Sequence, residues 1–134
     1  MQSVTKPRDA EWELAQDIGE LTSLTAYANM PQRILPPCLA VAQVGIVPMT
    51  PTVWKHSFSI DVWAGSGSDY ADAWDAANDV AGALGLLNVQ RASSDNDWHE
   101  ITVANLYPNP DTNRPDIPRV TLTCSAGLTG TPII

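Results

Sequence analysis

The sequence is short of charge, of cysteine and of long apolar runs. Only 16% of its 134 residues are charged, against about a quarter in a typical globular domain, so we expect part of the surface to lie against other chains. The two cysteines are too few for a disulfide framework. No apolar run approaches the roughly 20 residues of a membrane span, and residues 1–20 are too polar for a signal peptide. These absences predict a chain that folds in a reducing cytoplasm, without membrane contact.

Basic residues are also scarce. Seven stand against fifteen acidic residues, which gives a formal net charge of −8. So acidic a chain repels the phosphates of nucleic acids and of anionic membranes. Specific DNA binding is therefore disfavoured, although DNA that slides past without being gripped is compatible with this charge. Apolar residues, at 44%, and five tryptophans are present in sufficient number for one core and for aromatic interface anchors.

The hydrophobic pattern predicts a single α+β domain with the element order α-β-β-α-β-β. Residues 52–63 alternate between apolar and polar side chains, which is typical of an antiparallel strand with one wet face. We expect a mostly antiparallel or mixed four-stranded sheet with two helices on one face, and loose tails at residues 1–7 and 127–134. The predicted helices cover 8–28 and 69–87, and the predicted strands cover 38–47, 52–63, 98–106 and 117–126.

Three kinds of active or ligand-binding site each fail on particular residues. The turn Gly65–Ser68 leads into a helix as phosphate-binding turns do, but Tyr70 replaces the third glycine and Asp69 adds negative charge. No serine occupies a nucleophile elbow, and neither cysteine has a neighbouring histidine. A zinc site has no supporting ligand spacing in its only candidates, Cys38, Cys124, His56 and His99. We therefore predict no catalytic residue, no metal and no cofactor.

Two features are candidates for contacts with other molecules. The second helix carries Asp72, Asp75 and Asp79 on one arc, which indicates a solvated face, a weak metal site, or a wall past which an anion slides. Fixed proline geometry and aromatic anchors in the loop at 107–116 suit protein contacts, although an ordinary hairpin connection is the alternative. The interface candidates are Trp12, Trp98, Tyr107, Pro108, Asn109 and Arg114.

The order of segments over residues 8–126 resembles the tail terminator, or tail completion, proteins of long-tailed bacteriophages. A first helix leads into Pro-Pro and a buried strand (PPCLAVAQVGIV). A strand ending in Asp-Val-Trp runs through a Gly/Ser turn into an alanine-rich helix (FSIDVWAGSGSDYADAWDAANDVAGAL). The last segment, YPNPDTNRPDIPRVTLTCSA, is similar to the P-D-x-x-x-R-P lead into the final strand of such proteins.

This resemblance implies a non-enzymatic virion protein of the tail or neck, assembled in the host cytoplasm. It implies a ring, usually of six copies, that sits on the tail tube, stops its growth and offers the head-joining surface. The partners would be other copies, the tail tube protein and a head–tail connector protein. DNA would pass through the lumen without specific binding, beside some of the acidic residues. The alternatives are another neck protein, a monomeric small-ligand or peptide-binding module, and, third, an enzyme.

Overall fold

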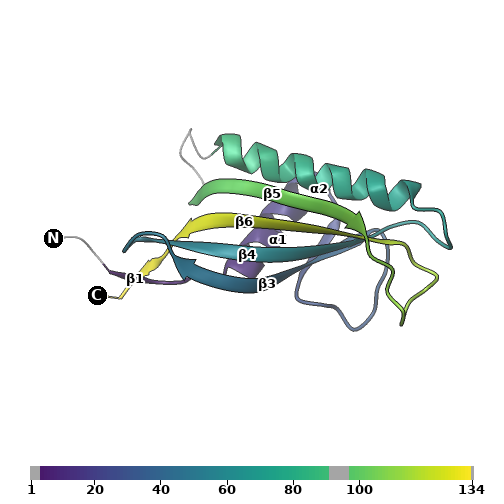
Figure 1. The fold of residues 1–134 in the computed structure, drawn as a ribbon, viewed down its shortest axis with the longest axis horizontal. Helices are drawn as coiled ribbons and strands as arrows, with labels where there is room; N and C mark the ends of the chain where they lie inside the picture. Colours follow the sequence, from purple (N-terminus) through teal and green to yellow (C-terminus); the bar gives the residue numbers. More distant parts are fainter. Residues whose placement is uncertain (1–3, 91–96, 134) are drawn as a thin grey trace.

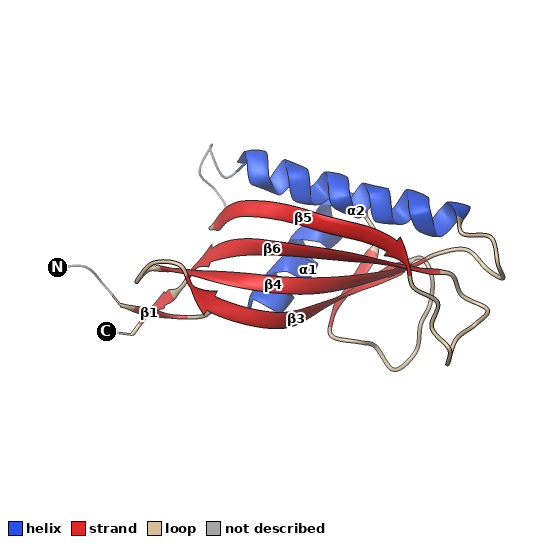
Figure 2. Ribbon diagram, viewed as in Figure 1, coloured by secondary structure: helices blue, strands red, loops and turns tan. Residues whose placement is uncertain are grey.

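Two helices cover one face of a mixed five-stranded sheet, and a separate pair of short strands joins the two ends of the chain (Figures 1 and 2). The computed structural model describes residues 4–90 and 97–133. The sheet order is β2-β3-β4-β6-β5. In chain order the elements are β1 (Thr5–Lys6), α1 (Ala10–Thr22), β2 (Thr25–Ala28), β3 (Cys38–Pro48), β4 (Val53–Trp63), α2 (Ala71–Gln90), β5 (Trp98–Pro108), β6 (Arg119–Thr129) and β7 (Thr131–Pro132).

The first helix is shorter than predicted, and the difference adds a strand to the sheet. The Asp9 side chain accepts a hydrogen bond from the Trp12 backbone N–H at 3.2 Å and caps the start of α1. Ser23 adopts a left-handed conformation, φ 62°, and ends the helix. Residues 25–28, expected to be helical, instead form β2, which pairs in parallel with β3 from Cys38 to Val41. The α+β class is confirmed, but the predicted count of four strands is wrong.

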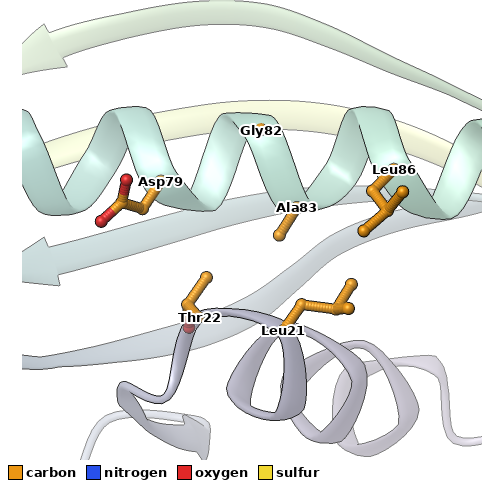
Figure 3. A pocket seen from close by; sticks show the side chains of 6 residues that line it. All are labelled: Leu21, Thr22, Asp79, Gly82, Ala83 and Leu86. Carbon is orange, nitrogen blue, oxygen red and sulfur yellow. The ribbon is translucent and has the colours of Figure 1, made fainter.

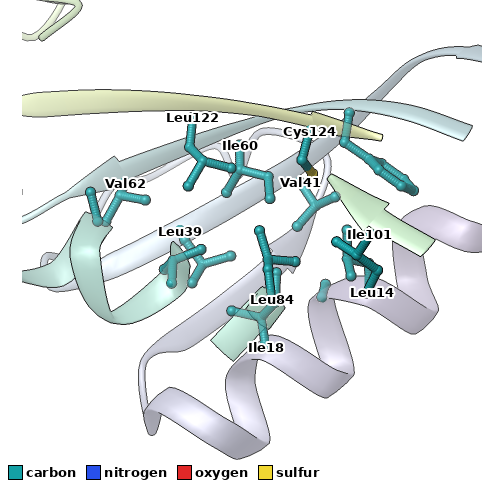
Figure 4. Close-up of a cluster of buried hydrophobic side chains, with 14 of the residues drawn as sticks. Leu14, Ile18, Leu39, Val41, Ile60, Val62, Leu84, Ile101, Leu122 and Cys124 are labelled. Carbon is teal, nitrogen blue, oxygen red and sulfur yellow. The ribbon is translucent and has the colours of Figure 1, made fainter. Parts of the chain in front are cut away.

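One core fills the space between the helices and the sheet (Figure 4). In α1 the side chains of Leu14 and Ile18 are fully buried, four residues apart on one stripe. In α2 the buried residues follow a similar spacing, and four of the seven are alanine. The strands contribute alternate residues to the same layer, as β geometry requires: Leu39, Val41, Phe58, Ile60, Val62, Val120 and Leu122 are all buried.

The segment at 127–134 is not the loose tail that its composition predicts. Strand β6 continues to Thr129, and β7 pairs with β1 so that Thr5 lies opposite Pro132. The backbone N–H of Thr5 donates to the Pro51 carbonyl at 3.1 Å, and that of Gly130 donates to the Thr52 carbonyl at 2.9 Å. Both ends are therefore held at the turn between β3 and β4, although residues 1–3 and 134 of the predicted tails lie outside the described range.

Candidate assembly surfaces

The turn between β3 and β4 carries a concentration of exposed apolar side chains, which we call the hairpin end (residues 44–54). Strand β2 covers β3 only as far as Val41, so the later residues pair with β4 alone. Val44 is 67% exposed, Val47 55% and Met49 46%. The sequence pattern predicted a well-buried strand over 38–47, and this is wrong for its second half. An apolar segment left so open is a candidate for an interaction surface.

The hairpin end has no acidic residue of its own. Residues 42–57 contain no acidic residue, and Lys55 is exposed at the start of β4. Lys6 of β1 is also exposed, and β1 is tied to the hairpin through the bond from Thr5 to Pro51. One acidic residue, Glu100, lines a hollow of about 130 Å³ together with Lys55 and Met49.

The backbone at both edges of the sheet is partly occupied by side chains of the helices. The Glu11 carboxylate of α1 accepts a hydrogen bond from the Gln43 N–H at 2.8 Å, next to a bulge in β3. The Asn88 carbonyl of α2 accepts one from the Ile101 N–H at 2.9 Å, within a bulge of β5. Such devices discourage strand-to-strand pairing between molecules. We therefore expect contacts at these edges to use side chains rather than backbone.

A groove of about 410 Å³ runs between the end of α1 and the middle of α2 (Figure 3). Leu21 and Leu86 line it and are 39% and 45% exposed. Gly82 leaves it open, because nothing lies within 4 Å of the position that a Cβ would take there. The remaining lining residues are Thr22, Asp79 and Ala83.

All charged residues of the two helices around this groove are acidic. Four acidic residues lie in α1 and three in α2, and neither helix contains a lysine or an arginine. The remaining eight of the fifteen acidic residues are nearly balanced by all seven basic ones. Almost the whole net charge of the protein is therefore concentrated in the helix layer. The predicted arc of Asp72, Asp75 and Asp79 is exposed on α2, and Asp79 is on the rim of the groove.

The two tryptophans predicted as interface anchors differ in position. Trp12 is 54% exposed on α1 and is free to contact another chain. Trp98, which was expected to be exposed, is buried, because its indole N–H reaches the Asp17 carboxylate at 2.7 Å and its ring packs edge-on against Phe58. Its contacts within the subunit join β5 to α1.

The predicted interface loop is stabilised by an ion pair and by hydrogen bonds within the subunit. Strand β5 extends through Tyr107 and Pro108, which are exposed, so the loop begins at Asn109. Arg114 bonds to Asp111 at 3.0 Å, and the Arg119 Nε donates to the Asn109 carbonyl at 2.6 Å. The pKa of Asp111 is lowered, chiefly by the hydrogen bond from the Asn113 N–H and further by the two arginines. Asn109 and Arg114 thus serve to shape the loop.

The candidate ligand residues are engaged or buried. His56 is buried, and its ring lies nearly parallel to that of Phe58 with the centroids 6.1 Å apart. It shares a 2.7 Å hydrogen bond between its Nδ1 and the Gln43 Oε1, and burial lowers its pKa. His99 bonds to the Thr129 hydroxyl. Burial raises the pKa of the Cys124 thiol to about 12. Among residues 4–90 and 97–133, no group of three His, Cys, Asp or Glu side chains is arranged to hold a metal.

The Gly/Ser turn before α2 has a structural explanation. Gly65 and Gly67 have φ values of 82° and 68°, which other residues rarely adopt. The Gly67 N–H donates to the Asp116 carbonyl at 2.8 Å, and the Asp69 carboxylate accepts from the Ala71 N–H at 3.0 Å. These contacts fix the turn against the loop and cap the helix.

In the described part of the chain, no helix is long and apolar enough to cross a membrane.

Sequence reasoning missed the hairpin end and the groove. The run Val44–Met49 is apolar on both sides of the strand, and that pattern alone does not reveal whether a neighbouring strand covers it.

A scan against protein-family models finds no match for this chain, and no curated protein matches its sequence.

Proposed function

We propose that this chain is a non-enzymatic assembly subunit that forms a ring closing a phage tail tube. The observation that carries the proposal is the hairpin end, where apolar side chains from β3 and the following turn face the solvent. A subunit that must join a larger structure keeps such a surface available. The segment order that resembles tail terminators supplies the kind of assembly, most simply a ring of six copies.

The partners follow from the same proposal. One face of the ring would meet the tail tube protein and the other a head–tail connector protein, so that the ring ends tube growth within the virion. DNA would pass through the lumen without specific contacts, which suits an acidic protein. Trp12, Tyr107 and Pro108 are exposed and available for these contacts. The acidic residues Asp72, Asp75 and Asp79 belong either to the lumen or to a contact between subunits.

The first test is the native mass of the purified chain, measured by native mass spectrometry across a range of concentrations and combined with negative-stain electron microscopy. Closed rings, or a monomer that forms rings once tail tubes are supplied, support the proposal. A monomer that does not associate with tail tubes and binds a small molecule or a peptide would exclude the proposed ring and favour the binding-module alternative.

A further inference from the structure

We propose that the hairpin end of one copy docks into the groove between α1 and α2 of the next copy. The inference rests on the proposed function, because a ring is built from a head-to-tail contact in which each subunit presents two different surfaces. The hairpin end and the groove are two such surfaces on one chain. The hairpin end has protruding apolar side chains and lysines, and the groove has unfilled space and acidic residues.

The hairpin end supplies apolar side chains, and the N–H groups of Met49 and Thr50 in its turn already donate to the Val53 carbonyl. Val47 and Met49 are about half exposed, and Pro48 between them has no N–H to offer to a strand. The Glu11 carboxylate already occupies the Gln43 N–H nearby. The segment is thus suited to insert side chains into a groove rather than to extend a sheet.

The groove supplies apolar walls and unfilled space. Leu21 and Leu86 form its exposed walls. Glycine in an exposed helix is less stable than alanine, yet α2 has glycine at positions 82 and 85, where nothing in the described structure lies within 4 Å of an added Cβ. Packing inside the subunit therefore does not require these glycines. A neighbouring chain that approached α2 closely would give both glycines a function.

The charges of the two surfaces favour the hairpin end as the segment that binds in the groove. The rim residue Asp79 belongs to a helix layer that contains acidic residues and no basic ones. The hairpin end contains no acidic residue of its own and has exposed Lys55, with exposed Lys6 on the strand tied to it. The acidic residue beside it is Glu100 of β5, which lines the same hollow as Lys55. Docking therefore brings opposite charges together, which favours the correct pair over others. Contact between two grooves would oppose acid to acid, and contact between two hairpin ends would stop at a dimer.

The decisive experiment is cross-linking between two single-cysteine variants. Met49→Cys and Gly82→Cys are purified separately, mixed, and treated with a short bismaleimide; the native Cys38 and Cys124 are buried and stay out of the reaction. We expect a covalent dimer in the mixture and none with either variant alone. Ser68→Cys, in the exposed turn before α2, replaces Gly82→Cys in the control mixture and should give no product.

The outcomes separate the two proposals. Rings that form without the 49–82 product overturn the docking and leave the ring standing. A product from Met49→Cys alone indicates contact between two hairpin ends and also overturns the docking. A chain that stays monomeric, with or without tail tubes, overturns the proposed function together with the docking.

A charge exchange supplies an independent test. Lys55→Glu and Asp79→Lys should each weaken self-association about tenfold, measured by analytical ultracentrifugation, while the double variant recovers most of the loss. Asn105→Lys, at an exposed position of β5 that does not line the groove, is the control and should leave association unchanged. Failure of the double variant to recover contradicts the docking, provided that circular dichroism shows each variant folded.

Discussion

The two halves of β3 are similar in composition and opposite in environment. Residues 38–41 pair with β2 on one side and β4 on the other, and all four are buried. Residues 42–48 continue the same strand with β4 alone, and their exposure rises to 67% at Val44. The sequences CLAV and VGIV are equally apolar, so the difference comes from the short strand β2 and from where it ends.

This difference teaches that one strand can serve two purposes. The first half stabilises the fold, because burial of apolar surface contributes about 25 cal/mol per Å². The second half contributes little to the stability of the subunit and leaves the same type of side chain exposed. Substitutions along β3 should therefore separate stability from assembly, and the following predictions test this from the largest expected effect to the smallest.

Leu39→Ala should destabilise the subunit most. Leu39 is fully buried in the core, and a Leu→Ala change at such a site costs about 2–5 kcal/mol. Val44→Ala in the exposed half is the control and should cost less than about 0.5 kcal/mol. Urea unfolding followed by tryptophan fluorescence measures both, and equal costs would contradict the division of the strand.

Gln43 stands at the boundary between the two halves. Gln43→Leu removes the partner of the His56 Nδ1, whose ring Nε2 already lacks a partner within the described residues, so we expect a loss of about 1–3 kcal/mol. Replacing both residues by leucine removes the buried polar groups together and should cost less than the single change. A double variant less stable than Gln43→Leu in urea unfolding would show that the hydrogen bond is unimportant.

Acidification should destabilise the subunit through the same histidine. Because burial lowers the pKa of His56 below its ordinary 6.5, the unfolded chain takes up a proton as the pH falls below 6.5 while the folded chain does not. Stability should then decrease by at most about 1.4 kcal/mol per pH unit from this group. Urea unfolding at pH 7.5 and 5.5 measures the loss, which should shrink in His56→Leu; an unchanged pH dependence would assign it to other groups.

Glu11→Ala should expose the edge of β3 at the point where its two halves meet. Loss of the bond to the Gln43 N–H costs about 1 kcal/mol and frees a backbone donor for pairing with other strands. We expect an increase in thioflavin-positive aggregates at constant concentration. Glu11→Gln retains an acceptor oxygen and serves as the control; aggregation equal in both variants would mean that the carboxylate does not protect the edge.

Val47→Ser should have the smallest effect on stability and a clear effect on assembly. Val47 is 55% exposed, so the change in the free energy of unfolding should be within about 0.5 kcal/mol. Ring formation measured by native mass spectrometry should nevertheless decrease, because an apolar contact with the neighbour is lost. Unchanged ring formation would place the contact elsewhere on the hairpin end.

Local patterns predicted much of the fold. The alternation over 52–63 corresponds to β4 at Val53–Trp63, and the alanine-rich helix corresponds to α2. The parts that were missed depend on residues far apart in sequence. Ser23 ends α1 without the glycine that usually signals such a turn, and β2 exists because the edge of β3 accepts it. Trp98 is buried because Asp17, in another element, receives its N–H.

Interaction surfaces were harder to predict than helices and strands, because the exposure of a residue depends on residues far from it in sequence. The exposure of Trp12 and Tyr107 follows from their positions on a helix and at a strand end. By contrast, Asn109 and Arg114 occur in a loop typical of contacts, yet the network around Asp111 and Arg119 uses them within the subunit. Polar residues in a loop do not reveal from sequence alone whether their partners lie inside or outside the chain.

The pairing of β1 with β7 has a practical consequence for protein engineering. Because Thr5 lies opposite Pro132, a short linker between the two strands would join the ends without crossing the domain. New ends opened in the loop after β5 would give a circular permutant with the same sheet. A tag fused directly before β1 or after β7 would lie near the turn of the β3–β4 hairpin, whereas in the permutant it would lie at the far end of the sheet.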